Sequence, residues 1–390
     1  MKKRRVVVLG ATGSIGASAA KVANDIPDRM EIVGMSANRN TAKLAELSAQ
    51  FPHARLAVCD PEKLPSDLRT KTFSGEDALV DLATMPEADM VLIAIVGTAG
   101  LRPALAAIEA GKDLAIASKE ILVMAGEIVI EAARKKGVKI LPVDSEHNAI
   151  FQCLENREPA EVRRLILTAS GGPFRTWPAE KLASVTREQA LQHPTWQMGE
   201  KITTDSATLF NKGLEMIEAH WLFGVEMARV EVVVHPQSIV HSLVEFVDGS
   251  VLAQLSHSDM CFPIQYAVTW PERVANTLRP LDLAELGKLE FESPRFADFP
   301  ALDLARRAGA TGGTLPAVLN AANEIAVDAF LQQKMSFPSI WQTVARVMDD
   351  HRCVAHPQLD AILQADSWAR TRAAELIEST PLAASNAALN

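Results

Sequence analysis

The sequence predicts an α/β protein with three parts: a parallel, doubly wound sheet at the N-terminal end, a central α+β region and a C-terminal group of helices. Two observations lead to this fold class. Short apolar runs rich in β-branched residues alternate with helical stretches in the first part of the chain. Near the other end, apolar residues recur at intervals of three and four, which is typical of amphipathic helices. At 390 residues, the chain has room for two or three domains of about 150 residues each.

The N-terminal part contains the repeated strand and helix pattern. A first strand is expected at 5–9, and a glycine-rich turn and a helix follow it directly. Further strands are expected at 31–35, 56–59, 90–96 and 113–117, with a helix at 41–50 and a last strand near 139–143. Strands that alternate with helices favour a parallel sheet.

The pattern changes after residue 163. Apolar strands are expected at 165–167, 230–234 and 239–246, separated by long polar segments, and helices are expected at 315–330, 340–348 and 368–377. The proline-rich stretch between them has no clear period and is predicted to be a linker. We therefore place domains at 1–144, 145–275 and 301–390, with the linker at 276–300.

Composition excludes several classes of protein. The net charge is −9, and no basic stripe with interleaved aromatic residues is present, which argues against a nucleic-acid partner. The most apolar stretch, 90–101, is shorter than the roughly 18 residues that span a bilayer, which argues against a membrane partner. The four cysteines are far apart and form no CxxC pair. This pattern suits a reducing compartment, and we expect a cytoplasmic protein.

The glycine-rich turn is the first motif with a chemical meaning. It runs from Gly10 to Gly16 through Ala11, Thr12, Gly13, Ser14 and Ile15, with the spacing GxxGxxG and not the stricter GxGxxG. Because it follows the first strand and opens a helix, it favours binding of a dinucleotide pyrophosphate at the helix N-terminus. The alternative is a tight turn without a ligand.

The end of the second expected strand indicates which dinucleotide would bind. An NAD site usually has an acidic residue there for the ribose hydroxyls, whereas this chain has the run Ser36, Ala37, Asn38, Arg39, Asn40. Arg39 is suited to a 2′-phosphate, so NADP(H) is favoured over NAD. The alternative is that Arg39 and Asn40 cap the next helix.

Two carboxylates, Asp144 and Glu146, follow the last strand of this part. If the strand stays extended, residues i and i+2 project from the same face and both carboxylates converge on one cation. Hard oxygen ligands favour Mg²⁺ or Mn²⁺. A helix N-cap with an acidic first turn explains the same residues equally well.

A third motif runs from Asp205 to Glu218. Leu214, Ile217 and Trp221 form the apolar stripe of a helix, and Asn211, Glu215 and Glu218 lie on another face. Near the helix start, Ser206, Asn211 and Lys212 offer the donors that a phosphate monoester needs. The third carboxylate of a metal site would then come from Glu215. The alternative is an ordinary solvated amphipathic helix.

Two loops form the fourth motif. A Ser-Gly-Gly turn at 170–172 follows a strand and is suited to an anion. The segment 193–199, His-Pro-Thr-Trp-Gln-Met-Gly, is typical of a lid that excludes water, and the alternative is that its Trp fills a core. His241 on a strand is either a core histidine or an active-site one. The run from Asn320 to Glu324 is expected to cap and pair within the helical domain, and we assign it no chemistry.

Taken together, these motifs resemble 1-deoxy-D-xylulose 5-phosphate reductoisomerases, in order along nearly the whole chain. The resemblance is carried by segments 10–16, 118–120, 143–148, 170–175, 193–199, 205–215, 235–238 and 320–324. Several are long and idiosyncratic, so they are far more specific than the glycine turn. One departure is Ser118, where the family usually has Asn.

The resemblance implies an N-terminal Rossmann-like dinucleotide-binding domain, a central α+β catalytic and metal-binding domain with a lid, and a C-terminal helical domain. It implies NADPH-dependent conversion of 1-deoxy-D-xylulose 5-phosphate to 2-C-methyl-D-erythritol 4-phosphate in non-mevalonate isoprenoid biosynthesis. The enzyme would be a homodimer that uses Mg²⁺, Mn²⁺ or Co²⁺.

The resemblance also implies site residues. The metal ligands would be Asp144, Glu146 and Glu215. The substrate would contact Lys119, Ser145, Glu146, Ser170, His193, Ser206, Asn211, Lys212 and Glu215. The cofactor would contact Gly10, Thr12, Gly13, Ser14, Ile15, Ala37, Asn38, Arg39, Asn40, Ser118, Glu120 and Gly199. The catalytic residues would be Lys119, Glu146, His193, His241 and the lid residues Trp196 and Met198.

Two other functions are weighed against this one. A metal-assisted NADP-dependent dehydrogenase of a phosphorylated hydroxy acid would transfer a hydride without changing the carbon skeleton. A nucleotide-sensing protein would bind the dinucleotide without catalysis, but such a sensor has no need of a hard-metal site beside a phosphate site.

Overall fold

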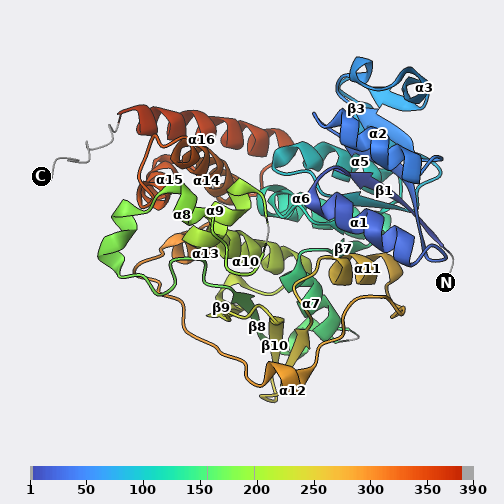
Figure 1. The fold of residues 1–390 in the computed structure, drawn as a ribbon. Helices are drawn as coiled ribbons and strands as arrows, with labels where there is room; N and C mark the ends of the chain where they lie inside the picture. The colour runs from blue at the N-terminus through green and yellow to red at the C-terminus, as the bar shows by residue number, and fades with distance from the viewer. Residues whose placement is uncertain (1–2, 156, 197, 380–390) are drawn as a thin grey trace, which may run out of the picture. The chain divides into compact units, whose positions relative to one another are not determined.

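A computed structural model describes residues 3–155, 157–196 and 198–379 (Figure 1). The predicted lid residue 197 and the last eleven residues of the predicted helical domain, 380–390, lie outside the described residues. The chain forms two compact units. The first unit comprises 1–122, 126–155 and 254–282, and the second comprises 123–125, 156–253 and 283–390.

The first unit contains a seven-stranded sheet in the order β4-β3-β2-β1-β5-β6-β7, and every neighbouring pair is parallel. The strands are β1 (Arg4–Leu9), β2 (Met30–Ala37), β3 (Arg55–Val58), β4 (Thr72–Ser74), β5 (Met90–Ile93), β6 (Asp113–Ile116) and β7 (Ile140–Pro142). The strand order reverses between β1 and β5. In open parallel sheets, ligands bind beyond the carboxyl ends of the strands at such a reversal.

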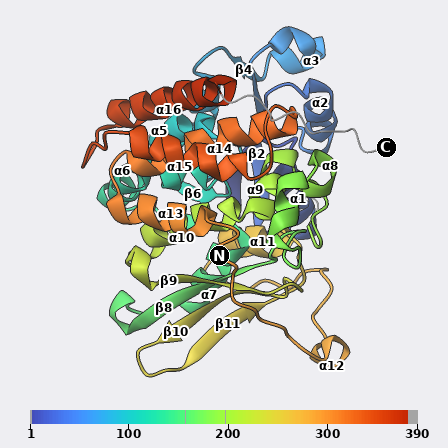
Figure 2. The ribbon, with the colours of Figure 1, turned by 90° about the vertical axis from the view of Figure 1, so that its left-hand side faces the viewer.

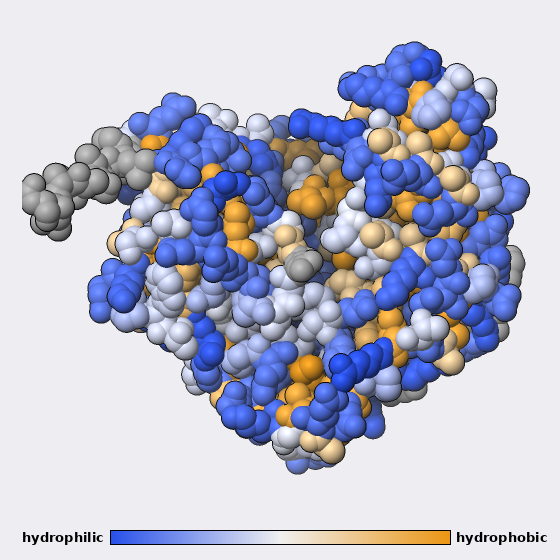
Figure 3. Space-filling view, in the orientation of Figure 1, coloured by the Kyte–Doolittle hydropathy of each residue, from blue (hydrophilic) through white to orange (hydrophobic). Residues whose placement is uncertain are grey.

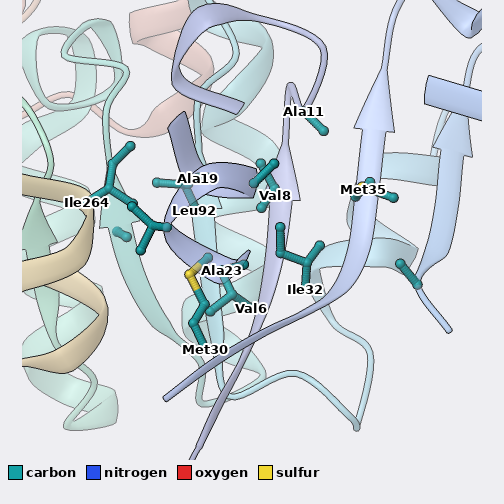
Figure 4. Close-up of a cluster of buried hydrophobic side chains, with 14 of the residues drawn as sticks. Val6, Val8, Ala11, Ala19, Ala23, Met30, Ile32, Met35, Leu92 and Ile264 are labelled. Atoms are coloured by element: carbon teal, nitrogen blue, oxygen red, sulfur yellow. The ribbon is translucent and has the colours of Figure 1, made fainter. Parts of the chain in front are cut away.

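Helices cover both faces of this sheet because successive side chains of a strand point to opposite faces. The helices of this unit are α1 (Ser14–Asp25), α2 (Thr41–Gln50), α3 (Ser66–Arg69), α4 (Ala78–Ala83), α5 (Leu101–Glu109), α6 (Glu120–Lys136), α7 (Ser145–Cys153) and α11 (Cys261–Thr269). From β1, Val6 and Val8 enter a core that includes Ala19 of α1 and Ile264 of α11 (Figure 4). Val7 lies on the other face of the sheet. There its side chain and that of Leu82 from α4 both lie next to Gly34 of β2.

The second unit contains a four-stranded sheet and most of the later helices. Its strands are β8 (Val162–Ala169), β9 (Val230–Val234), β10 (Val240–Phe246) and β11 (Val251–Leu255). They lie side by side in the order β11-β10-β8-β9 (Figure 2). β8 pairs with β9 in parallel and with β10 in antiparallel orientation, so the sheet is mixed.

The helices of the second unit include α8 (Arg187–Ala190), α9 (Glu200–Thr208), α10 (Phe210–Phe223), α12 (Leu283–Leu286) and α13 (Ala301–Thr311). They continue with α14 (Leu315–Leu331), α15 (Ser339–Asp350) and α16 (Leu359–Ser379). α14 packs against α15 and α16, and it also contacts α9. This last contact joins the C-terminal helices to the segment that carries Ser206.

The predicted fold class is confirmed: a Rossmann-like parallel sheet, a second sheet and C-terminal helices are all present. The structure adds β4 and β11, two edge strands that the sequence analysis did not predict. The contact-based units also differ from the predicted domain ranges, because residues 254–282 return to the first unit and place α11 against α1 and α7. The functional division of the chain at 144, 275 and 300 stays a prediction.

Within the described residues, no helix is both long and apolar enough to cross a membrane. The face drawn in Figure 3 is largely hydrophilic, and its apolar residues form separate groups.

Candidate active site

The glycine-rich turn lies at the carboxyl end of β1, beside the start of the segment that follows β5. Gly10 has a φ of +91°, and a Cβ atom there would lie 2.5 Å from the carbonyl oxygen of Ala94, so only glycine fits this approach. Ser36 holds the turn from β2, because its hydroxyl accepts from the Gly10 amide at 3.0 Å. Among the described residues, no side-chain hydrogen bond caps α1 at Gly13, so the positive end of the helix is not capped by a side chain.

Of the two alternatives for the residues after β2, the structure shows the helix cap, which Asn40 provides. Asn40 caps α2, since its side chain accepts from the Lys43 amide at 3.1 Å. Asn38 and Arg39 are exposed beside it. Ser118, by contrast, is buried, and its hydroxyl donates to the Ile95 carbonyl at 2.5 Å. The residue that departs from the family pattern therefore bonds to the backbone just beyond β5.

A buried ion pair lies beyond the carboxyl ends of β6 and β7. Lys119, just before α6, donates to Asp144 at 2.5 Å, and both side chains are almost enclosed. Next to this pair, the Ser145 hydroxyl donates to the Glu146 carboxylate at 2.5 Å. Among residues 143–148, the sequence analysis assigned no role to His147, yet its ring is fully buried and its Nδ1 lies 3.9 Å from Asp144.

The charge state of Asp144 is set by opposing effects. Burial raises the pKa of Asp144, but the positive charge of Lys119 and the hydrogen bond and charge of His147 outweigh it. These effects of Lys119 and His147, together with a hydrogen bond to Glu146, hold the pKa of Asp144 well below the usual range of an aspartate. Asp144 is therefore a carboxylate at neutral pH, as a metal ligand must be.

The extended geometry expected for Asp144 and Glu146 is wrong. α7 begins at Ser145, with Asp144 at its N-cap position and Glu146 in its first turn, so the equally weighted helix alternative is the observed one. The physical reason is that β7 ends at Pro142 and an acidic first turn stabilises a helix N-terminus. The two carboxylates follow helical geometry and do not alternate along a strand.

In the second unit, Ser170, His193 and Ser206 form one cluster, which we call the serine–histidine cluster. The His193 Nε2 atom lies 3.0 Å from the hydroxyl oxygens of both Ser170 and Ser206. Its Nδ1 atom accepts from the backbone amides of Thr195 and Trp196, at 3.2 and 2.9 Å. The structure thus brings together Ser206 from the predicted phosphate motif and two residues, Ser170 and His193, from the predicted anion turn and lid loop.

The hydrogen bonds assign the protons in this cluster. Because Nδ1 accepts two amides, the ring proton is on Nε2, and Nε2 donates toward the two serine oxygens. The Ser170 oxygen also accepts from the Gly172 amide at 3.2 Å. Both serine hydroxyls therefore retain their own hydrogens for another acceptor. A pair of hydroxyl donors beside a histidine is suited to an anion.

The close packing of the Ser-Gly-Gly turn on α9 leads to a stability prediction. Gly172 has a φ of +67°, and a Cβ atom there would lie 2.9 Å from the Ser206 carbonyl oxygen. At the control position Gly249, φ is +86° and nothing lies within 4 Å. Gly249→Ala should cost about 1–2 kcal/mol of unfolding free energy from backbone strain alone. Gly172→Ala should cost at least about 1 kcal/mol more, because it adds a steric clash. Urea denaturation measures both values, and equal losses would contradict the packing.

The third polar group lies at the start of α10. A left-handed residue, Leu209 with φ 66°, separates α9 from α10. Asn211 donates to Glu215 at 2.5 Å, and Lys212 forms an ion pair with the other oxygen of Glu215. Lys212 and Glu215 are only 4% and 1% exposed, so the solvated-helix alternative is wrong for this face. A buried charge is costly unless an opposite charge pairs with it, as Glu215 does here with Lys212.

The described residues of the predicted lid segment precede α9, and the segment begins at His193 of the serine–histidine cluster. His193 fixes its first turn, and the Thr195 and Ser238 hydroxyls are 3.3 Å apart. The Trp196 ring lies 6.4 Å from the ring of His241, centre to centre, and His241 is 5% exposed. Gly199 is exposed at the N-cap of α9. His241 is thus buried next to Trp196, a position compatible with both a core histidine and an active-site histidine.

The geometry of the first unit defines a class of protein. A parallel sheet with this strand order and a glycine turn at the reversal is characteristic of dinucleotide-dependent oxidoreductases. Family models for 1-deoxy-D-xylulose 5-phosphate reductoisomerase match residues 6–126, and models for its C-terminal domains match 140–223 and 255–372. The chain belongs to the 1-deoxy-D-xylulose 5-phosphate reductoisomerase family.

Individual relatives agree over the full length. The chain is 53% identical over 383 residues to the 1-deoxy-D-xylulose 5-phosphate reductoisomerase of Symbiobacterium thermophilum, covering 96% of this chain and 98% of the relative. The same enzyme from an Anaeromyxobacter species is 54% identical over 353 residues, covering 89% and 90%.

Solved structures are also similar. The Zymomonas mobilis reductoisomerase in complex with NADPH has a TM-score of 0.90 and 45% identity, covering 97% of this chain and 100% of that one. A reductoisomerase in complex with NADPH, fosmidomycin and magnesium has a TM-score of 0.88 and 39% identity, covering 96% and 98%.

Proposed function

We propose that this protein converts 1-deoxy-D-xylulose 5-phosphate to 2-C-methyl-D-erythritol 4-phosphate with NADPH and a divalent cation, a step of non-mevalonate isoprenoid biosynthesis. The observation that carries the proposal is that the family match extends over both units while each unit keeps its own buried polar group. The first unit holds Asp144 with Lys119, and the second holds Glu215 with Lys212.

The metal ligands in this proposal are Asp144, Glu146 and Glu215. The donor set fits a hard divalent cation, because all three side chains are carboxylates. Two of them are paired here with lysine ammonium groups, which supply the positive charge that buried carboxylates require. A cation bound there supplies a Lewis acid for the carbonyl and hydroxyl oxygens of the substrate. A magnesium complex of a relative is known, and we propose that Mn²⁺ and Co²⁺ also serve.

The substrate phosphate would bind the serine–histidine cluster, with Asn211 and Lys212 as further donors. Two hydroxyls oriented by His193, together with an ammonium group, match the oxygens of a phosphate monoester. Binding energy from this remote group would orient the reacting carbons. Ser145 would contact the substrate beside Glu146.

The cofactor would lie along the carboxyl edge of the first unit's sheet. The first amides of α1 would take the pyrophosphate, and Arg39 would take the 2′-phosphate. NADPH supplies the hydride that reduces the rearranged aldehyde. The residues assigned to cofactor contact are Gly10, Thr12, Gly13, Ser14, Ile15, Ala37, Asn38, Arg39, Asn40, Ser118, Glu120 and Gly199. Lys119 would stand between cofactor and substrate.

The loop at 193–199 would act as the lid. Trp196 and Met198 would cover the reacting carbons and exclude water from the aldehyde. His241, buried beside Trp196, would support the closed loop. We further propose that the protein is a cytoplasmic homodimer. Its binding partner besides the cofactor and metal would be a small phosphorylated sugar, and it would bind neither nucleic acid nor membranes.

The test is oxidation of NADPH, followed at about 340 nm, with 1-deoxy-D-xylulose 5-phosphate in the presence of Mg²⁺ or Mn²⁺ and in excess chelator. Oxidation that requires both substrate and metal supports the proposal. If the folded protein binds NADPH by calorimetry but never oxidises it, the nucleotide-sensing alternative is favoured and the proposal fails.

A further inference from the structure

Helix α14 carries two asparagines that the proposed reaction does not use. Asn320 and Asn323 are both 0% exposed. The sequence analysis expected the segment 320–324 to pair within the helical domain. Asn320 does so, because it donates to Glu324 at 3.1 Å, but Asn323 contacts a different helix.

Asn323 binds a buried carboxylate on α9. Its side-chain amide donates to Oδ1 of Asp205 at 2.7 Å, and Lys201 pairs with Oδ2 of Asp205 at 2.8 Å. Asp205 is 1% exposed, while the Lys201 side chain is 23% exposed. Each carboxylate oxygen of Asp205 therefore has its own donor: Oδ1 accepts from the Asn323 amide, and Oδ2 pairs with the Lys201 ammonium.

The position of Asp205 next to Ser206 gives this contact its importance. Ser206 belongs to the serine–histidine cluster, and its hydroxyl lies 3.0 Å from His193. A shift of α9 at Asp205 moves Ser206 by a similar amount. A poorly compensated carboxylate would also repel an anion bound one residue away, since charges in a low-dielectric interior interact strongly.

The polar pairing is retained at a cost to stability. The Asn323 side-chain oxygen is buried and has no hydrogen-bond partner among the described residues. The Asn320 side-chain oxygen is in the same state, so the two asparagines differ in the partner of the NH₂ group and not in this cost. The amide orientation is set by Asp205, because only the NH₂ end can donate to a carboxylate.

We propose that Asn323 is a positioning residue for phosphate recognition: it holds Asp205 so that α9 presents Ser206 to the substrate phosphate. This inference rests on the proposed function, in which Ser206 contacts that phosphate. It connects the C-terminal helices to the site through one buried hydrogen bond.

Asn320 provides a matched control on the same helix. It has the same residue type and burial, but its partner Glu324 is held by Arg370 of α16 at 2.7 Å. Asn320→Ala and Asn323→Ala therefore remove the same atoms from α14. Loss of general stability should affect both variants, whereas loss of Ser206 positioning should affect only the second.

The experiment compares KM for 1-deoxy-D-xylulose 5-phosphate, kcat and the Kd for NADPH in the wild type and both variants. We expect Asn323→Ala to raise KM about tenfold, equal to about 1.4 kcal/mol, with a smaller change in kcat and an unchanged Kd for NADPH. Asn320→Ala should leave KM within twofold. Equal KM values in the two variants would overturn the inference.

An exchanged pair tests the same contact when the alanine variant does not fold. Asn323→Asp places two carboxylates face to face and should raise KM more than alanine does. Adding Asp205→Asn restores an amide–carboxylate pair in the reverse order and should lower KM again, whereas no recovery would contradict the inference. A wild type without turnover would instead overturn the proposed function, and this inference would fall with it.

Discussion

Replacing Glu215 with glutamine should reduce kcat by at least about a thousandfold, because the site loses one of three proposed metal carboxylates while keeping its shape. Glu215 is 1% exposed, and it accepts from both Asn211 and Lys212. The substitution also removes the negative charge that pairs with the buried Lys212 ammonium, which should lower the free energy of unfolding by on the order of 3 kcal/mol.

Steady-state kinetics, NADPH calorimetry and thermal melting of Glu215→Gln separate these effects. NADPH affinity should stay within about twofold, since the proposed cofactor residues belong almost entirely to the first unit. Glu226→Gln, at an exposed position just after α10, is the control and should retain wild-type kcat. A folded Glu215→Gln protein with normal turnover would remove Glu215 from the metal site.

The second large effect is expected for Lys119→Met. The ammonium of Lys119 lowers the pKa of Asp144, while burial raises it. Without the lysine, the burial effect is opposed only by the weaker contributions of His147 and Glu146, so the pKa of Asp144 should rise. We also expect kcat to fall by about 10²–10³, the usual loss when one group that stabilises developing charge is removed.

The pH dependence follows from the direction of this shift. In the wild type, the lowered pKa of Asp144 contributes stability that is present above the unfolded value of about 3.9 and is lost as pH falls through the folded value. Lys119→Met loses that contribution. As the pH is lowered, its turnover and melting temperature should therefore begin to fall at a higher pH than those of the wild type. Lys136→Met, at an exposed ion pair, is the control. If turnover and melting temperature fall at the same acidic pH in Lys119→Met and the wild type, the role assigned to the Lys119–Asp144 pair is wrong.

The sequence predicted the sheet of the first unit well because its signals are local. Each central strand is a short apolar run, and the glycine turn has its expected strand and helix on either side. The edge strands β4 and β11 were missed, since three to five residues without alternation give little periodic signal. The return of 254–282 to the first unit depends on distant packing, which no local pattern encodes.

The candidate site was predictable where a motif carries its chemistry within a few residues. Ser206, Asn211 and Lys212 fit this description, whereas the joining of Ser206 with Ser170 and His193 depends on contacts between separate segments. The geometry of Asp144 and Glu146 was not predictable, because an extended strand and a helix N-terminus explained this pair of carboxylates equally well. The segment 320–324 was noted from sequence, but the pairing of Asn323 with Asp205 could not be predicted, since the two residues are 118 positions apart.

One chain should both rearrange the carbon skeleton of the substrate and reduce it. Carbon NMR of the product formed from isotopically labelled 1-deoxy-D-xylulose 5-phosphate, NADPH and Mn²⁺ distinguishes this from reduction alone. We expect a branched polyol phosphate, 2-C-methyl-D-erythritol 4-phosphate, formed in equal amount to the NADPH consumed. A reduced product with the unbranched skeleton of the substrate would contradict this expectation and would identify a simple metal-assisted dehydrogenase instead.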